Sequence, residues 1–258
     1  MHPILFQFFS IKLYSYGLFA AFAFLAAFFY ISSRAAKTKP ILMEQNALQN
    51  LFLYCAAIAI FGARLMYVLM NLQTFSQAPL DIFKIWEGGL VYYGGFVCAV
   101  LFVILYLKKH KIAVLKFSDI IAPALALGHA LGRIGCFFAG CCYGKPCDLP
   151  WSVVFSNADS LALKNVHIHP TQLYEFLFNF LIFLILHLYN KKAHKDGKAA
   201  AFYLIMYSLM RFIIEFFRGD ERGEFFLGLS PAQNISIVLF IFGILLLLFI
   251  LRQKTSDR

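Results

Sequence analysis

The chain has few charged residues, and acidic residues are the scarcest of them. Only 14% of its 258 residues are charged, with 13 acidic side chains against 23 lysines and arginines. A soluble domain carries roughly 25% charged residues, so this composition excludes an ordinary water-soluble fold. Hydrophobic residues make up 61% of the chain instead. They form apolar runs of about 20 residues, the length of a bilayer-spanning helix, and therefore predict an all-α integral membrane protein.

Other features are missing as well. The first thirty residues have no basic segment followed by a small-residue cleavage site, so we expect the run from Tyr16 to Ile31 to be retained as a span. The sequence also shows no internal repeat, no low-complexity segment and no stretch of soluble-domain composition. We therefore expect one polytopic membrane domain over residues 1–258, whose longest loop lies at about 141–169.

The apolar runs predict seven transmembrane helices, at about 14–32, 48–70, 89–107, 118–140, 170–189, 199–217 and 230–251. Of the 23 lysines and arginines, 14 lie at one set of helix ends, six at the other set and three within spans. Basic residues accumulate on the cytoplasmic side of membrane proteins. This predicts an N-terminus outside, a C-terminus in the cytoplasm and an outward-facing 141–169 loop. It also explains the net charge of +10 without nucleic acid, which is not expected as a partner.

Polar side chains within the predicted spans collect at one depth. Laid out by the predicted direction of each span, they fall in the outer leaflet on five or six helices: Tyr16, Arg64, Tyr93, Arg133, Gln172, Glu175, Arg211 and Arg218. Arginine inside a membrane is costly and marks a functional site by default. Scattered structural residues would not share a depth, so we expect a water-accessible, partly cationic cavity that faces the outer leaflet.

Two segments favour an anion in this cavity. His169 and Pro170 precede the fifth span, where free N–H groups and the positive end of the helix dipole attract negative charge. Arg211, Glu215 and Arg218 share one face of the sixth span at spacings i, i+4 and i+7. Arg218 is suited to hold a phosphate through two parallel hydrogen bonds. The competing interpretation is an interfacial salt bridge, with Arg218 reaching the headgroups.

Two further groups leave alternatives open. Gln172, Glu175 and Asn179 form a polar stripe that either holds helices together or contacts a ligand. Arg64 is expected either to bind substrate or to form a structural ion pair with Glu87 or Glu175, and the structural role is slightly favoured.

Glycine pairs flank the start of the third span. Gly88-Gly89 and Gly94-Gly95 permit either close helix packing or a break in the helix.

Four of the six cysteines fall within twelve residues on the predicted outer side: Cys136, Cys141, Cys142 and Cys147. Metal sites usually show C-x2-C pairs, whereas the spacing here is C-x4-C-C-x4-C, so no metal site and no cofactor is predicted. A disulfide is chemically permitted outside the cytoplasm. Small packing residues are the favoured interpretation.

Six short motifs occur in an order that is familiar. They are Tyr16-Gly17, Gly62-Ala63-Arg64, Trp86-Glu87-Gly88-Gly89, Gly132-Arg133-Ile134-Gly135, His169-Pro170-Thr171-Gln172-Leu173-Tyr174-Glu175 and Glu215-Phe216-Phe217-Arg218. They cover the chain from Tyr16 to Arg218, and on them the chain resembles the prolipoprotein diacylglyceryl transferases, integral enzymes of the bacterial inner membrane. The resemblance implies seven spans with the N-terminus outside, as the charge distribution predicts.

The resemblance also implies a reaction. The diacylglyceryl group of phosphatidylglycerol moves to the lipobox cysteine thiol of a prolipoprotein signal peptide, a thioether forms, and glycerol-1-phosphate leaves. Catalytic roles in holding the phosphate and stabilising its departing charge fall to Arg133 and Arg218. Substrate binding falls to Arg133, Tyr16, Arg64, Gln172, Glu175 and Arg218. Membrane lipids surround the site.

The chain departs from the family pattern at the positions that bear on the acceptor of the thiol proton. Many members carry a histidine where this chain has Tyr93, and asparagine and glutamate where it has Cys136 and Cys141. Tyr93 is the preferred catalytic candidate, either as a tyrosinate activated by arginine or as a hydrogen-bond donor to the lipid. His129 and His169 are the alternatives.

Two other classes of protein fit parts of the sequence. A transporter or anion channel also lines its pathway with arginines, but inverted repeats and midplane polar groups would be expected, and neither is visible. A thiol-redox or metal-binding membrane protein would be built on the cluster from Cys136 to Cys147, and replacing those cysteines would discriminate it.

Overall fold

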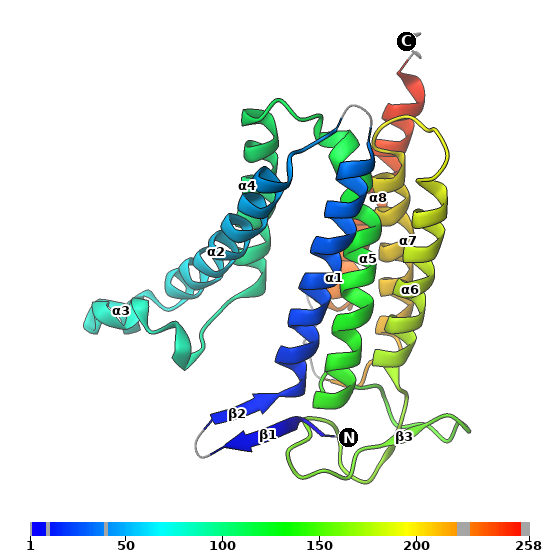
Figure 1. The fold of residues 1–258 in the computed structure, drawn as a ribbon. Coiled ribbons are helices and arrows are strands. Elements are labelled where there is room, and N and C mark those ends of the chain that lie inside the picture. The colour runs from blue at the N-terminus through cyan, green and yellow to red at the C-terminus, as the bar shows by residue number, and fades with distance from the viewer. Residues whose placement is uncertain (1, 9–10, 39–40, 221–227, 254–258) are drawn as a thin grey trace. The chain divides into compact units, whose positions relative to one another are not determined.

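The computed structural model describes residues 2–8, 11–38, 41–220 and 228–253, and long helices occupy all seven predicted positions (Figure 1). They are α1 (Ser15–Lys37), α2 (Gln45–Met70), α4 (Tyr92–Lys109), α5 (Val114–Ala139), α6 (Thr171–Tyr189), α7 (Lys198–Glu215) and α8 (Pro231–Arg252). Shorter helices connect α2 to α4: α3 (Leu72–Gln77), η1 (Pro79–Phe83) and η2 (Ile85–Glu87). Four basic residues of the charge count lie outside the described residues, namely Lys39, Arg222, Lys254 and Arg258.

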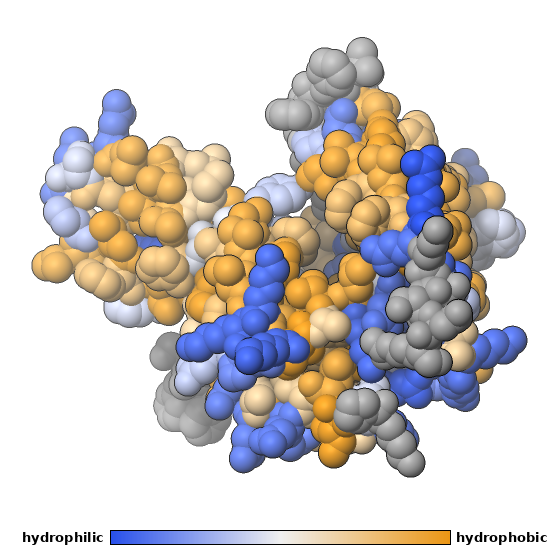
Figure 2. All heavy atoms as spheres, turned by 90° about the horizontal axis from the view of Figure 1, so that it is seen from above, coloured by the Kyte–Doolittle hydropathy of each residue, from blue (hydrophilic) through white to orange (hydrophobic). Residues whose placement is uncertain are grey.

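Six of the long helices, all except α7, are long and apolar enough to cross a membrane. In contrast, α7 carries Lys198, Arg211 and Glu215 within 18 residues, so its composition does not mark it as a span. Hydrophobic residues cover much of the surface that Figure 2 shows. The exposed apolar side chains of α8 include Val238, Phe242 and Leu245. Continuous exposed apolar surface of this kind is typical of contact with lipid. The prediction of a mostly helical membrane protein is therefore confirmed.

Internal contacts divide the chain into two compact units. Residues 32–117 form the small unit, and residues 1–31 together with 118–258 form the large unit. The single membrane domain over the whole chain stays a prediction.

Glycines hold α2 against α4 in the small unit. A Cβ atom added at Gly94 would lie 2.4 Å from the Gly62 carbonyl oxygen, and one added at Gly95 would lie 2.6 Å from the Ala59 carbonyl oxygen. Helix α4 runs without a break through both glycines. Close packing is therefore the role of the Gly94-Gly95 pair. Gly88 and Gly89 lie before α4 with φ of +90° and +72°, a conformation that only glycine adopts freely.

Helices α5, α6 and α7 share the apolar core of the large unit. It is formed by Ala122, Ala126, Ile182, Leu186, Ala199 and Tyr203. Asp119 of α5 fixes the start of α7, because its carboxylate accepts hydrogen bonds from the backbone N–H groups of Gly197 (2.7 Å) and Ala200 (2.9 Å). A carboxylate at this position also interacts favourably with the helix dipole.

Four short strands accompany the helices and were not predicted. Strands β1 (Ile4–Phe8) and β2 (Ile11–Tyr14) form an antiparallel hairpin that leads directly into α1. Strands β3 (Val153–Val154) and β4 (His167–Ile168) pair within the long loop between α5 and α6. Phe155, Ala162 and Ile168 form a small core under this loop. A period-2 signal over two to five residues is too short to stand out beside runs of 20 apolar residues.

Candidate active site

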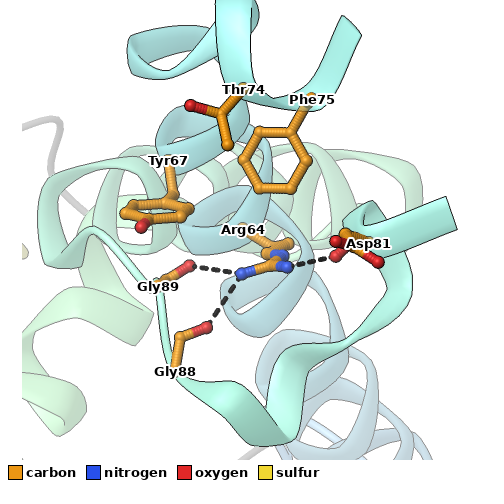
Figure 3. Close-up of a pocket in the computed structure, with 7 residues that line it drawn as sticks. All are labelled: Arg64, Tyr67, Thr74, Phe75, Asp81, Gly88 and Gly89. Atoms are coloured by element: carbon orange, nitrogen blue, oxygen red, sulfur yellow. Dashed lines mark hydrogen bonds between the residues drawn. The ribbon is translucent and has the colours of Figure 1, made fainter. Parts of the chain in front are cut away.

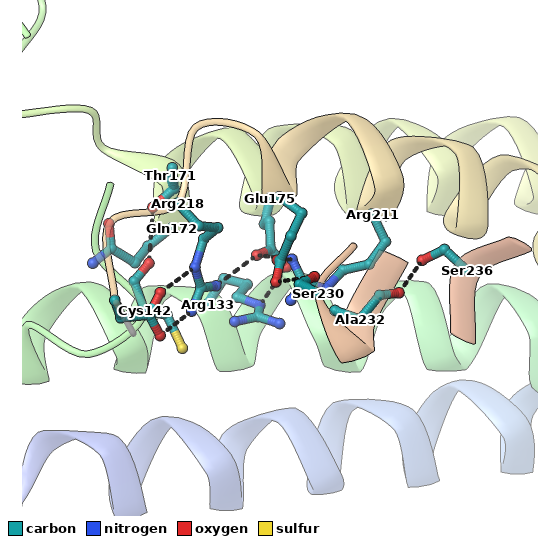
Figure 4. Close-up of polar contacts among 12 residues, drawn as sticks. Arg133, Cys142, Thr171, Gln172, Glu175, Arg211, Arg218, Ser230, Ala232 and Ser236 are labelled. Carbon is teal, nitrogen blue, oxygen red and sulfur yellow. Dashed lines mark hydrogen bonds and ion pairs between the residues drawn. The ribbon is translucent and has the colours of Figure 1, made fainter. Parts of the chain in front are cut away.

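Three arginines in the large unit converge on one glutamate (Figure 4). Glu175 lies in α6, one turn from the start of the helix. Its Oε2 atom forms an ion pair with Nε of Arg133 in α5 at 2.8 Å. Its other carboxylate oxygen lies 3.4 Å from Nη1 of Arg211 in α7 and 3.3 Å from Nη1 of Arg218. Glu175 is 1% exposed, and it thus joins three segments of the chain at one buried point.

Further carboxylates balance the charge of this cluster. Arg211 pairs with Glu215 at 2.7 Å. Nε and Nη2 of Arg218 each donate a hydrogen bond to one carboxylate oxygen of Asp220, both at 2.7 Å. Three arginines therefore meet three carboxylates among the described residues. Burial lowers the pKa of Arg218, but the hydrogen bonds and negative charge of Asp220 and Glu175 raise it above its ordinary value. Its guanidinium stays cationic at any physiological pH.

The start of α6 binds the turn that follows α5. Thr171 donates a hydrogen bond to the Cys142 carbonyl oxygen at 2.8 Å, and Gln172 donates one to the Cys141 carbonyl oxygen at 2.8 Å. Gln172 and Asn179 are fully buried, and Gln172 Oε1 and Asn179 Oδ1 have no hydrogen-bond partner among the residues that the structure describes. The predicted polar stripe is buried and joins elements through Gln172, and it still leaves acceptor atoms unused.

Three cysteine sulfurs gather beside the arginines. Cys136 is the last buried residue of α5. The Sγ atoms of Cys136, Cys141 and Cys142 all lie within 4.8 Å of one another. Hydrogen bonds from the other two thiols, and then the charges of Arg218 and Arg133, lower the pKa of Cys142, while burial opposes this shift. The hydrogen bonds with Cys136 and Cys142 raise the pKa of Cys141. The sequence spacing did not indicate this convergence.

Both histidine candidates have aromatic partners. His129 Nδ1 lies 3.1 Å from the Tyr203 hydroxyl, in the helix core one turn below Arg133, and its ring lies 5.0 Å from that of Tyr207. His169 Nδ1 lies 3.3 Å from the Tyr174 hydroxyl, and its ring packs against Phe217 at 5.3 Å. These contacts give both imidazoles a structural explanation.

Tyr16 belongs to the same site. It is half exposed at the start of α1, and its phenol lies within electrostatic range of the three cysteines and of Arg133. Gly135 allows this approach, because a Cβ atom there would meet Phe19 Cβ at 2.9 Å and Tyr16 Cα at 3.3 Å.

Arg64 and Tyr93 lie in the small unit. Arg64 Nε donates to the Ile82 carbonyl oxygen at 2.9 Å, and Nη1 donates to those of Gly88 (2.8 Å) and Gly89 (3.2 Å). Figure 3 shows its guanidinium among the residues that line a pocket, namely Arg64, Tyr67, Thr74, Phe75, Asp81, Gly88 and Gly89. The volume of this pocket is about 190 Å³. These bonds support the structural role that the sequence favoured. The Glu87 side chain, one of its expected partners, lies outside what the structure describes.

Tyr93 is 51% exposed on the first turn of α4, and its ring packs edge-on against Tyr92 at 5.7 Å. The Tyr93 side chain is therefore exposed on the small unit.

Asp220 and Ser230 are members of the site that the sequence did not single out. Ser230 donates a hydrogen bond to Glu215 Oε1 at 2.9 Å and also caps α8. A serine before Pro231, with Gln233 three residues later, is a capping-box pattern, but it predicts a helix start and not a bond to Glu215. For the pair of Arg218 and Asp220, the signal in the sequence is an aspartate two residues after the arginine.

Membrane-length helices and a buried cluster of three arginines and three carboxylates define a multi-pass membrane protein with charged groups in its interior. The sequence profile of the family described as prolipoprotein diacylglyceryl transferase matches residues 3–249. The chain belongs to this family, whose members are enzymes of lipoprotein biosynthesis.

Relatives with the name phosphatidylglycerol–prolipoprotein diacylglyceryl transferase cover nearly the whole chain. The protein of Clostridium tetani is 39% identical over 244 residues, which are 95% of this chain and 96% of the relative. A protein of Clostridium perfringens is 36% identical, with 95% and 94% covered. That of Geobacter sulfurreducens is 31% identical, with 98% and 97% covered.

Proposed function

We propose that this chain transfers the diacylglyceryl group of phosphatidylglycerol to the lipobox cysteine of prolipoprotein signal peptides. The observation that carries the proposal is the convergence of Arg133, Arg211 and Arg218 on Glu175, in a chain that belongs to this family. The substrate thiol attacks the glyceryl carbon bonded to the phosphate, a thioether forms, and glycerol-1-phosphate leaves.

Arg133 and Arg218 hold the phosphate in this reaction. Both arginines act electrostatically on the sulfur of Cys142. Arg133 is the more exposed of the two, with 20% of its side chain accessible. Negative charge develops on the leaving phosphate oxygen, and fixed cations in a dry site stabilise it at no cost of reorganisation. Glu175 positions both guanidinium groups before the lipid enters.

The remaining site residues bind or orient substrate. Gln172 Oε1 is a buried acceptor without a donor among the described residues, and it is suited to accept a hydrogen bond from a lipid hydroxyl. Tyr16 contacts the lipid from α1. Tyr93 donates a hydrogen bond to the lipid or, as a tyrosinate, accepts the thiol proton. His129, His169 and Arg64 have structural roles, which their hydrogen bonds within the chain support.

The membrane arrangement is part of the proposal. Helix α7 also spans the membrane, which brings the number of spans to seven. Its three charged residues lie at its ends or in the arginine cluster, where ion pairs offset their cost. The N-terminus and the 141–169 loop face outward, the C-terminus is cytoplasmic, and the membrane is the bacterial inner membrane.

The test is direct. Purified protein is incubated with phosphatidylglycerol and a lipobox peptide, and the peptide mass is measured. We expect an increase equal to one diacylglyceryl group. A peptide whose lipobox cysteine is replaced by serine is the control and gains nothing. An unchanged parent peptide would contradict the proposal.

A further inference from the structure

Cys136, Cys141 and Cys142 bring three sulfurs to one point from two sides of a bend. Cys136 lies in the last turn of α5, and the other two follow Gly140, whose φ of +76° reverses the chain. All three Sγ atoms lie within 4.8 Å of one another. Zinc binds thiolate sulfur at about 2.3 Å, which places two tetrahedral ligands roughly 3.8 Å apart. Small side-chain rotations are enough to bring the three sulfurs to that spacing.

The backbone of this bend is held in place. Cys142 has a φ of +62°, which is uncommon for a residue with a side chain. Hydrogen bonds from Thr171 and Gln172 to the carbonyl oxygens of Cys142 and Cys141 fix the turn from the start of α6. The bend therefore holds the three sulfurs close together, as a preorganised ligand set requires.

Nearby arginines favour ionised sulfur, the form of cysteine that binds a metal, at this point. Three thiolates with one divalent ion leave a net charge of −1, and Arg133 and Arg218 act electrostatically on the same sulfur, that of Cys142. Soft sulfur donors select zinc and similar ions over calcium or magnesium. Three protein ligands are the number found in zinc sites that keep a fourth position for a reactant.

We propose that Cys136, Cys141 and Cys142 bind a zinc ion whose fourth position takes the sulfur of the substrate cysteine. This rests on the proposed function. On binding, the S–H bond of the substrate breaks and its proton goes to water. The resulting thiolate forms the C–S bond to the glyceryl carbon. The C–O bond to the phosphate breaks, and its electron pair leaves on the phosphate oxygen beside Arg133 and Arg218.

The proposed zinc site accounts for the loss of the substrate thiol proton, which the candidate proton acceptors explain less well. A free thiol ionises with a pKa of about 8.5, and an isolated tyrosine is a poor base because its pKa is about 10. Both histidines are held by tyrosines. A coordinated thiol loses its proton outright, so no side chain has to act as the base.

Metal binding is tested on the full-length protein, reduced and purified in detergent. Cobalt(II) replaces zinc as the probe, because cobalt bound by thiolates absorbs visible light. We expect absorption that saturates at one cobalt per chain and disappears when zinc is added. The variants Cys136→Ser, Cys141→Ser and Cys142→Ser lose it, whereas Cys55→Ser and Cys98→Ser, which change cysteines of the small unit, keep it. Absence of the signal in the reduced parent, or a disulfide that persists among the three cysteines, would overturn the site.

A second measurement guards against misfolded variants. Zinc should raise the melting temperature of the parent and of Cys98→Ser but leave that of Cys142→Ser unchanged. Equal shifts in all three proteins would place the metal elsewhere.

The fourth position is tested with the lipobox peptide. Adding it to the cobalt-loaded parent should change the absorption spectrum, and a peptide with serine in place of cysteine should not. Chelation should lower transfer at least tenfold, and zinc should restore it. Full transfer by the metal-free protein would overturn the role in thiol ionisation. If the zinc-loaded parent transfers nothing, the proposed function fails, while the absorption test still decides the metal site.

Discussion

At the scale of single residues, Glu175 carries more contacts of the site than any arginine does. It pairs with Arg133, Arg211 and Arg218, and it is almost fully buried. Removing one partner of a buried ion pair leaves the other charge uncompensated, which costs about 3–5 kcal/mol.

We therefore expect Glu175→Gln to lower the melting temperature of the purified protein by several degrees, even though the side chain keeps its size. Thermal unfolding in detergent measures this. Glu44→Gln is the matched control, because Glu44 is exposed before α2 and caps no helix with its side chain. Equal melting temperatures for the parent and Glu175→Gln would contradict the arrangement of the cluster.

Arginine and lysine are not equivalent at the phosphate site. Lysine keeps the positive charge but loses the planar fork that grips two oxygens. We expect Arg133→Lys and Arg218→Lys each to reduce diacylglyceryl transfer by roughly 100-fold with normal membrane insertion, the loss typical for one oxyanion-stabilising group. Arg252→Lys at the end of α8 is the control. Near-full activity of Arg133→Lys would exclude its bidentate role.

Tyr93 and the histidines give a separate comparison. We expect Tyr93→Phe to lower transfer at least tenfold, because the hydroxyl of this exposed side chain is lost. Tyr92→Phe, the adjacent residue on α4, should stay near the parent rate. His129→Ala and His169→Ala should alter stability more than rate. Transfer measured from pH 6 to 9 decides the matter: a dead histidine variant beside an active Tyr93→Phe would move the catalytic role to that histidine.

At the scale of elements, the sequence predicted the helices well because membrane spans are long and carry a strong signal. All seven predicted positions hold helices, including α7, whose apolar run predicted a helix despite the charges of Arg211 and Glu215. The hairpin of β1 and β2 could not be predicted, since it depends on pairing over a few residues. The approach of Cys136 to Cys141 and Cys142 depends on the bend at Gly140, and residue spacing does not reveal a bend.

The α2–α4 contact gives a prediction at this scale. Gly94→Ala places a methyl group against the Gly62 carbonyl and Met66, and overpacking of this kind costs about 1–3 kcal/mol. We expect a lower melting temperature. Gly17→Ala in α1 is the control, because nothing lies within 4 Å of its added Cβ and alanine favours a helix. If both variants melt together, α2 and α4 do not pack as described.

At the scale of the whole molecule, the uneven distribution of lysine and arginine fixes the expected direction of every span. Tags at Met1 and near Asn157 should be accessible from outside intact cells, and a tag after Arg258 should react only in opened cells. Accessibility is measured by labelling with a reagent that does not cross membranes. Labelling near Asn157 only after the cells are opened would reverse the topology.

The charge of the arginine cluster has a consequence for the whole catalytic cycle. Glu175 already occupies the guanidinium groups of Arg133 and Arg218. If these arginines hold the lipid phosphate as proposed, the phosphate replaces one negative group by another. We then expect a net affinity equal to the difference between two similar attractions, so that phosphatidylglycerol is held loosely. We also expect the carboxylate of Glu175 to compete with glycerol-1-phosphate for the same guanidinium groups and so to promote product release after each turnover.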